Sequence, residues 1–130
     1  MPAPVSSAAV LYAKDLALVS GFYSAIAELP VTESEPGHVA LEANGFQLVV
    51  VAVPPHIATT IQIQSPPVRR EDTPIKLVFF VRSLAAAAVK VARLGGQMNP
   101  PEQSWQFQGA QVLDGHDPEG NVFQLRQAAR

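Results

Sequence analysis

The fold follows from two matching stretches of sequence, Val10-Leu11-Tyr12-Ala13-Lys14-Asp15-Leu16 and Val78-Phe79-Phe80-Val81-Arg82-Ser83-Leu84, which lie 68 residues apart. Each stretch runs apolar, apolar, aromatic, apolar, cation, helix cap, leucine. An apolar run of strand length followed by a capping Asp or Ser predicts a strand that leads into a helix. The chain therefore contains an internal repeat, and each copy begins with a strand and a helix.

The first copy continues with a helix and a hairpin. An apolar stripe at helical spacing follows the predicted cap Asp15 and consists of Leu16, Val19, Phe22, Tyr23 and Ile26. We expect this helix to end by Pro30, because proline cannot continue a helix. Residues 38–43 and 46–53 are largely apolar runs around Asn44-Gly45, a dipeptide that suits a tight hairpin turn.

The second copy repeats this order. Residues 75–81 predict a strand, and residues 84–94 predict an Ala-rich helix that stops at Gly95-Gly96. Two further strands are predicted over residues 105–113 and 122–127, joined by a turn-rich loop over 114–121 that contains His116. The tripeptide Phe46-Gln47-Leu48 recurs as Phe123-Gln124-Leu125, so both copies predict a βαβββ unit.

The connection between the copies is rich in proline. Residues 54–74 hold five of the twelve prolines, which favours an extended linker over a helix. With 130 residues, the chain has room for one domain. We predict a single domain over 1–130, with a first module at about 6–55, a linker at about 56–73 and a second module at about 74–130.

Composition excludes several classes of function. The net charge of -2 provides no basic field for nucleic acid or an anionic membrane. Because the chain has no cysteine, it lacks disulfides, a thiolate metal site and a cysteine nucleophile. No secretion-type leader and no apolar run of about 20 residues is present in the sequence, so we predict a cytoplasmic protein that uses neither nucleic acid nor membrane as a partner.

The repeat resembles the vicinal oxygen chelate superfamily, which includes glyoxalase I, extradiol dioxygenases and bleomycin-resistance proteins. The most specific marker is the stretch Asp117-Pro118-Glu119-Gly120-Asn121 before the last predicted strand, and Gly95-Gly96 after the second helix is another. The resemblance implies an α+β fold in which two βαβββ modules form a concave eight-stranded sheet around a ligand cleft. It also implies a homodimer, with modules paired either within one chain or between swapped chains.

The metal enzymes of that superfamily carry ligands on the first and last strands of each module. The resemblance places these positions at Ala8, Lys76, Gln47 and Gln124. A methyl group has no lone pair and an ammonium repels a cation, while two neutral amides make a poor site for Zn²⁺ or Fe²⁺. Neither His38, His56 nor His116 matches a ligand position, so we predict no metal and no cofactor.

The expected ligand-binding residues are Gln47, Lys76, Trp105, Phe107 and Gln124. If the last-strand resemblance holds, both glutamines face the cleft, since alternate strand residues share a face. On one continuous strand over 105–113, Trp105 and Phe107 would share a face with Gly109, Gln111 and Leu113, an apolar row that suits a pocket. The alternatives are that the two rings pack in the core or an interface, and that Lys76 reaches solvent.

These features favour a metal-independent protein that binds an organic small molecule in a cleft. The alternative is an enzyme: a metal-dependent lyase, isomerase or dioxygenase with unusual ligands, or a metal-free one that uses Lys76 or a carboxylate. Three glutamates, Glu33, Glu35 and Glu42, lie in or beside the first module's strands, where solvated edge charges explain them better than acid and base roles. A purely structural role is the third alternative.

Overall fold

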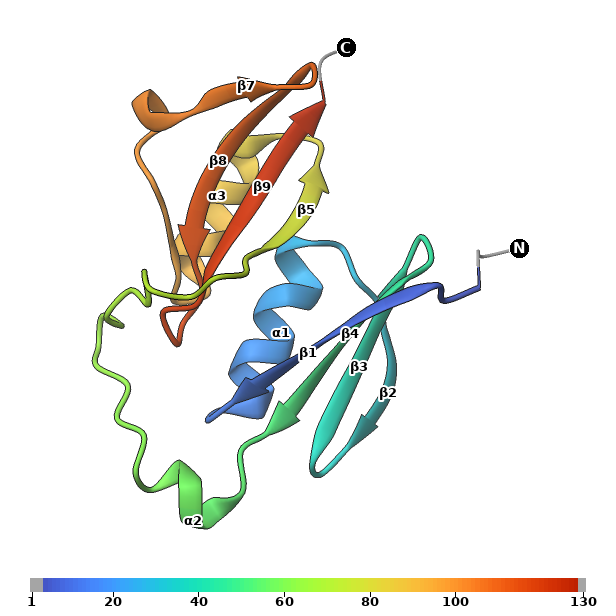
Figure 1. Ribbon diagram of the computed structural model, residues 1–130, viewed down its shortest axis with the longest axis vertical. Helices are drawn as coiled ribbons and strands as arrows, with labels where there is room; N and C mark the ends of the chain where they lie inside the picture. The colour runs from blue at the N-terminus through green and yellow to red at the C-terminus, as the bar shows by residue number, and fades with distance from the viewer. Residues whose placement is uncertain (1–3, 129–130) are drawn as a thin grey trace. The chain divides into compact units, whose positions relative to one another are not determined.

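The computed structural model describes residues 4–128. The chain forms two compact units, one ending at Gln62 and the other beginning at Ile63. In each unit one long helix lies on one face of that unit's own mixed sheet (Figure 1). The α+β class and the two βαβββ units are thus confirmed, while the predicted domain ends at residues 1 and 130 lie outside the described residues.

The first unit contains one four-stranded sheet in the order β1-β4-β3-β2, in which β1 and β4 are parallel. Its elements are β1 (Ser7–Ala13), α1 (Leu16–Ile26), β2 (Val31–Glu35), β3 (His38–Ala43), β4 (Phe46–Ala52) and the short α2 (Pro55–Ala58). The predicted hairpin is confirmed, since Asn44 and Gly45 have φ angles of 54° and 82° between β3 and β4. Sequence patterning gave no sign of β2, because all five of its residues are exposed.

The core of the first unit lies between α1 and its sheet. Asp15 caps the helix, accepting a hydrogen bond from the Leu18 amide at 3.1 Å. The predicted apolar stripe is buried at Val19, Phe22, Tyr23 and Ile26 against the fully buried strand residues Leu41, Leu48 and Val50. Alternation then leaves Ala8, Val10, Tyr12 and Gln47 on the sheet face opposite α1.

The second unit contains five strands, with the order β5-β9-β8-β6 and with β7 also paired to β8. Its elements are β5 (Leu77–Val81), α3 (Leu84–Arg93), β6 (Gln97–Met98), a 3₁₀ turn η1 (Pro101–Gln103), β7 (Trp105–Phe107), β8 (Ala110–His116) and β9 (Val122–Ala128). Both β6 and β7 pair with β8. They act as one strand interrupted at Pro100 and Pro101, since proline cannot donate to a sheet ladder.

The prediction of one strand over residues 105–113 is wrong. The chain turns back at Gln108 and Gly109, whose φ angles are 49° and 79°, so β7 and β8 form a hairpin. Reversal changes which side chains share a face: Trp105 pairs with Val112 and Phe107 with Ala110. The predicted row that joined the two rings to Gln111 and Leu113 therefore does not exist.

The linker is largely extended, as its prolines predicted, but it begins with one helical turn, α2. Pro55 stands at the first position of this turn, where the missing amide hydrogen is not needed. Within residues 4–128, no helix has the length and apolar character that crossing a membrane requires.

Candidate functional site

The open face of the second sheet, defined here as the face opposite α3, carries most of the predicted site residues. On the covered face, Phe79, Phe123 and Leu125 are buried. Strand pairing places the alternate residues on the open face, namely Val78, Phe80, Trp105, Phe107, Val112, Asp114, His116, Val122, Gln124 and Arg126. Lys76 comes just before β5 and reaches the same face through its ammonium group.

A continuous polar network crosses this open face. Asp114 Oδ2 lies 2.8 Å from the Lys76 ammonium, and Asp114 Oδ1 accepts a hydrogen bond from Gln124 Nε2 at 3.1 Å. Gln124 Oε1 in turn accepts a hydrogen bond from Arg126 Nε at 2.8 Å. Because Gln124 is only 7% exposed, both ends of its amide need partners, and the network supplies them.

Aromatic rings flank the far end of this network. The Arg126 guanidinium lies 5.0 Å from the centre of the Phe107 ring and 5.9 Å from that of Phe80, within cation–π range. Trp105 and Phe107 are 42% and 45% exposed, so neither ring belongs to the core of the unit. The structure therefore brings Lys76, Gln124, Trp105 and Phe107 onto one face.

The fifth predicted residue, Gln47, belongs to the first unit and has different surroundings. Its Nε2 donates to Glu42 Oε2 at 3.0 Å, and Thr32 Oγ1 donates to the same oxygen at 2.8 Å. These two hydrogen bonds hold the pKa of Glu42 below its ordinary value. Ala8 lies directly opposite Gln47 on β1 and adds no polar atom.

The four positions that the family resemblance assigns to metal ligands do not fit a metal. Ala8 offers a methyl group and Lys76 an ammonium paired with Asp114. Gln47 and Gln124 offer neutral amides, and the Gln124 oxygen already accepts from Arg126. In the described part of the chain, no three His, Asp or Glu side chains gather in a way that could hold an ion. The chemistry at these positions is that of hydrogen bonds and ion pairs.

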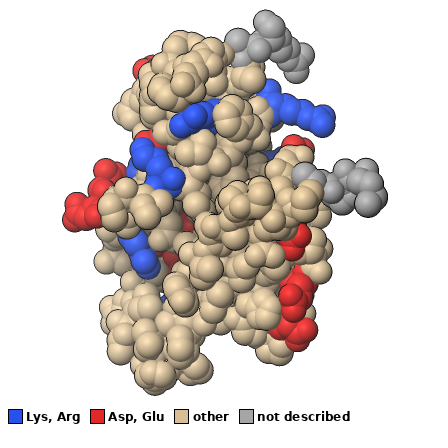
Figure 2. Space-filling view, turned by 45° about the vertical axis from the view of Figure 1, so that its right-hand side comes forward, with Lys and Arg blue, Asp and Glu red and all other residues tan. Residues whose placement is uncertain are grey.

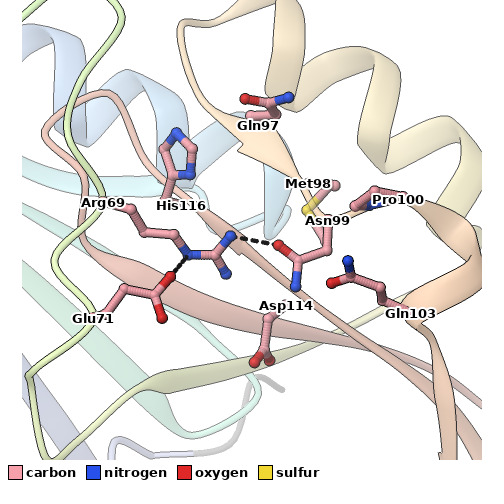
Figure 3. A pocket seen from close by; sticks show the side chains of 9 residues that line it. All are labelled: Arg69, Glu71, Gln97, Met98, Asn99, Pro100, Gln103, Asp114 and His116. Atoms are coloured by element: carbon pink, nitrogen blue, oxygen red, sulfur yellow. Dashed lines mark hydrogen bonds and ion pairs between the residues drawn. The ribbon is translucent and has the colours of Figure 1, made fainter.

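A cavity of about 550 Å³ opens beside the network at the β6 end of the second sheet (Figure 3). Its wall consists of Arg69, Glu71, Gln97, Met98, Asn99, Pro100, Gln103, Asp114 and His116. His116 was expected in a turn-rich loop, but it is the last residue of β8 and is 8% exposed. Burial, followed by the nearby Arg69 charge, lowers the pKa of His116, so its ring is held neutral.

The linker supplies one wall of this cavity because it docks on the loop before β9. The Arg70 amide donates to the Gly120 carbonyl at 2.8 Å. Gly120 has a φ of 86°, and a Cβ there would lie 2.1 Å from the Val68 carbonyl oxygen, so only glycine admits this contact. Asp117 is fully buried and fixes the loop by accepting from the amides of Glu119 and Asn121 at 2.8 and 3.0 Å.

Sequence reasoning missed three site residues. Asp114 was assigned to a loop, although its place on β8 follows once the hairpin is known. Arg126 could have been found, because it lies two residues beyond Gln124 on the same strand face. Arg69 lies in the proline-rich linker, where no local pattern marks it; it pairs with Glu71 at 2.9 Å and also lines the cavity.

Charge on the surface does not suggest a polyanionic partner. On the face shown in Figure 2, acidic and basic side chains form small separate groups on a mostly uncharged surface. The open-face cations Lys76 and Arg126 are each engaged, by Asp114 and by Gln124.

Comparison with known proteins identifies the family. Residues 8–126 match the family model described as a glyoxalase-like domain. A search of curated proteins found no match.

Solved structures share the fold at low sequence identity. FosX, a fosfomycin resistance protein from Listeria monocytogenes, is 18% identical, with a TM-score of 0.63 and coverage of 100% of this chain and 94% of that one. A glyoxalase/bleomycin resistance protein/dioxygenase family enzyme from Burkholderia phytofirmans is 15% identical, with a TM-score of 0.68 and coverage of 96% and 98%. A glyoxalase-related enzyme from Fulvimarina pelagi is 20% identical, with a TM-score of 0.63 and coverage of 94% and 86%.

These identities support a shared fold and no shared activity. The match over residues 8–126 and the two βαβββ units agree with the resemblance drawn from the repeat and from residues 117–121. The chain belongs to the glyoxalase-like family of the vicinal oxygen chelate superfamily.

Proposed function

We propose that this protein binds an organic small molecule on the open face of its second sheet and does so without a metal. The observation that supports this most directly is the network from Lys76 through Asp114 and Gln124 to Arg126. In the second module, the two positions that the family resemblance assigns to metal ligands are Lys76 and Gln124. Both side chains contact the carboxylate of Asp114 instead. Such a face is suited to binding by contact and hydrogen bonding.

The chemistry of this face suits a ligand with an apolar or aromatic body. Trp105 and Phe107 present flat, exposed rings, and Arg126 is held beside Phe107 by its bond to Gln124. Aromatic surface with a few fixed polar groups is the usual lining of a small-molecule site. The network fixes the polar groups in advance, which reduces the ordering that a ligand must impose.

Two measurements test this proposal. Untagged protein is analysed for bound metal and then screened against a library of organic compounds by thermal shift, with EDTA present. We expect less than stoichiometric metal and at least one compound whose affinity falls about tenfold in Trp105→Ala. Val89→Ala removes an apolar side chain that is also exposed but lies on α3, so it is the control and should bind normally. Stoichiometric Zn²⁺, Ni²⁺, Mn²⁺ or Fe²⁺, or no compound bound, would contradict the proposal.

We also infer a homodimer, with modules paired within a chain or between swapped chains. Both sheets have an edge strand that begins its unit, and in the first unit β1 exposes Val10 and Tyr12 at 59% and 64%. Exposed strand edges and apolar side chains of this kind are usually covered by a partner. Sedimentation at micromolar concentration should give twice 13.9 kDa, and a monomer would contradict it. A cytoplasmic location stays a prediction.

A further inference from the structure

Two buried polar atoms share one cavity and lack hydrogen-bond partners. Among residues 4–128, the buried side-chain nitrogen and oxygen atoms without such a partner are Arg69 Nε and His116 Nδ1. Both residues line the cavity shown in Figure 3. Because a buried polar atom is normally hydrogen-bonded, two buried nitrogens without a hydrogen bond in one wall indicate that a ligand completes the site.

Arg69 is held in place without being fully used. Its Nη1 donates to Asn99 Oδ1, and its Nε lies 2.9 Å from Glu71 Oε1, an ion-pair distance that lacks the alignment of a hydrogen bond. Glu71 is 70% exposed, so water weakens this pair. A guanidinium has five N–H groups, and these contacts leave donors for a ligand.

The other charges around the cavity are already matched. Asp114 holds the Lys76 ammonium at 2.8 Å and the Gln124 amide at 3.1 Å, so its negative charge is neutralised. The His116 ring is held neutral by its burial and by Arg69. Arg69 is therefore the cation in this wall that a ligand can engage, and a planar carboxylate is an anion that a guanidinium can bind through two parallel N–H···O bonds.

We propose that this cavity binds a small organic acid. Arg69 would bind its carboxylate, and His116 Nδ1 would form a hydrogen bond with another oxygen of the same molecule. The proposal rests on the proposed function and names its ligand class. A phosphate is disfavoured because its second negative charge would meet one guanidinium with Asp114 and Glu71 nearby. The cavity volume of about 550 Å³ lies within the range of small-molecule sites.

The test is an NMR titration of the full chain with pyruvate, in which a carboxylate stands beside a carbonyl. Pyruvamide replaces the carboxylate by a neutral amide of nearly the same shape, and inorganic phosphate replaces it by another anion. We expect the amides of Arg69, Asn99 and His116 to shift with pyruvate, and pyruvamide and phosphate to bind at least tenfold more weakly.

Two variants locate the binding. Arg69→Gln should weaken pyruvate at least tenfold, whereas Arg70→Gln, the same change at an exposed neighbour, should stay within twofold. His116→Leu keeps a similar volume without nitrogens and should weaken pyruvate several-fold. All variants are first checked for an unchanged spectrum elsewhere.

The results separate the two proposals. Equal affinity for pyruvate and pyruvamide, tighter binding of phosphate, or no effect of Arg69→Gln would overturn the carboxylate site. None of these outcomes would contradict the proposed function, which is tested by Trp105-dependent binding of a library compound without metal. A failed compound screen with EDTA present, or stoichiometric metal, would instead overturn the proposed function.

Discussion

The two units share one architecture and differ in what their strand glutamines do. Gln47 and Gln124 stand in the same tripeptide, on the last strand of each unit and on the face away from the helix. Gln47 contacts Glu42 at the surface, whereas Gln124 is buried between Asp114 and Arg126. A repeated motif therefore preserves the backbone, while the side chains around it decide the chemistry.

The largest expected effect tests the two faces of β9. Phe123 is fully buried under α3, so Phe123→Ala should lower the free energy of unfolding by about 3–5 kcal/mol. Gln124→Ala, at the next residue, removes little packing but leaves Asp114 and Arg126 without one hydrogen-bond partner each. This variant should lower the free energy of unfolding by about 1–3 kcal/mol. Urea titration compares the two, and equal losses would mean that the assignment of faces is wrong.

A smaller effect tests the contact between the linker and the loop before β9. The corresponding turn of the first unit, before β4, has no such linker contact among the described residues. Gly120→Ala forces a positive φ on alanine and places Cβ against the Val68 carbonyl oxygen. The strained φ alone should lower the unfolding free energy by about 1–3 kcal/mol, and the clash adds to this. Gly37→Ala meets no atom within 4 Å and serves as the control. Faster proteolysis of residues 68–71 in Gly120→Ala would locate the damage, and its absence would count against a docked linker.

The next effect compares the two carboxylates directly. Asp114→Ala leaves Lys76 and Gln124 without their partner and should lower the unfolding free energy by about 1–2 kcal/mol. Glu42→Ala removes the matching carboxylate of the first unit, where the surroundings are open to water, and should change it by less than about 0.5 kcal/mol. Similar changes in unfolding free energy for the two variants would show that the Asp114 network stabilises its unit no more than the Glu42 contacts stabilise theirs.

The smallest effect concerns pH. Because the folded pKa of His116 lies below the ordinary 6.5, the unfolded chain takes up its proton first as the solution is acidified. Stability should therefore fall as pH drops from about 6.5 toward the lowered folded pKa, and stay level with respect to this group above 6.5. His116→Gln should remove that part of the decline, measured by urea unfolding at several pH values. An unchanged slope in the variant would show that other groups cause it.

Much of the fold could be predicted because its signals are local. The caps Asp15 and Ser83, the Asn44-Gly45 turn and the apolar stripe of α1 each act within a few residues of themselves. The polar edge strand β2 and the turn at Gln108 and Gly109 were missed, since neither has a strong apolar pattern or a turn dipeptide of the usual kind.

The site could be predicted only in part. Alternation along β9 placed Gln124 away from the core, and the charge of Lys76 marked it as needing a partner. That partner, Asp114, depends on how β8 pairs with β9, and the place of Arg69 depends on a linker that docks through Gly120. Contacts of this kind join segments far apart in the sequence, so no local pattern predicts them.

Docking of the linker also sets the length of the tether between the two units. On one side Lys14 Nζ donates to the Ile61 carbonyl, and on the other the Arg70 amide holds the chain to Gly120. The stretch between Ile61 and Arg70 has eight residues, whose full extension reaches only about 28 Å. In the homodimer that we infer, with modules paired within or between chains, a short tether would raise the effective concentration of one unit near the other, and Gly120 would thereby influence which pairing forms.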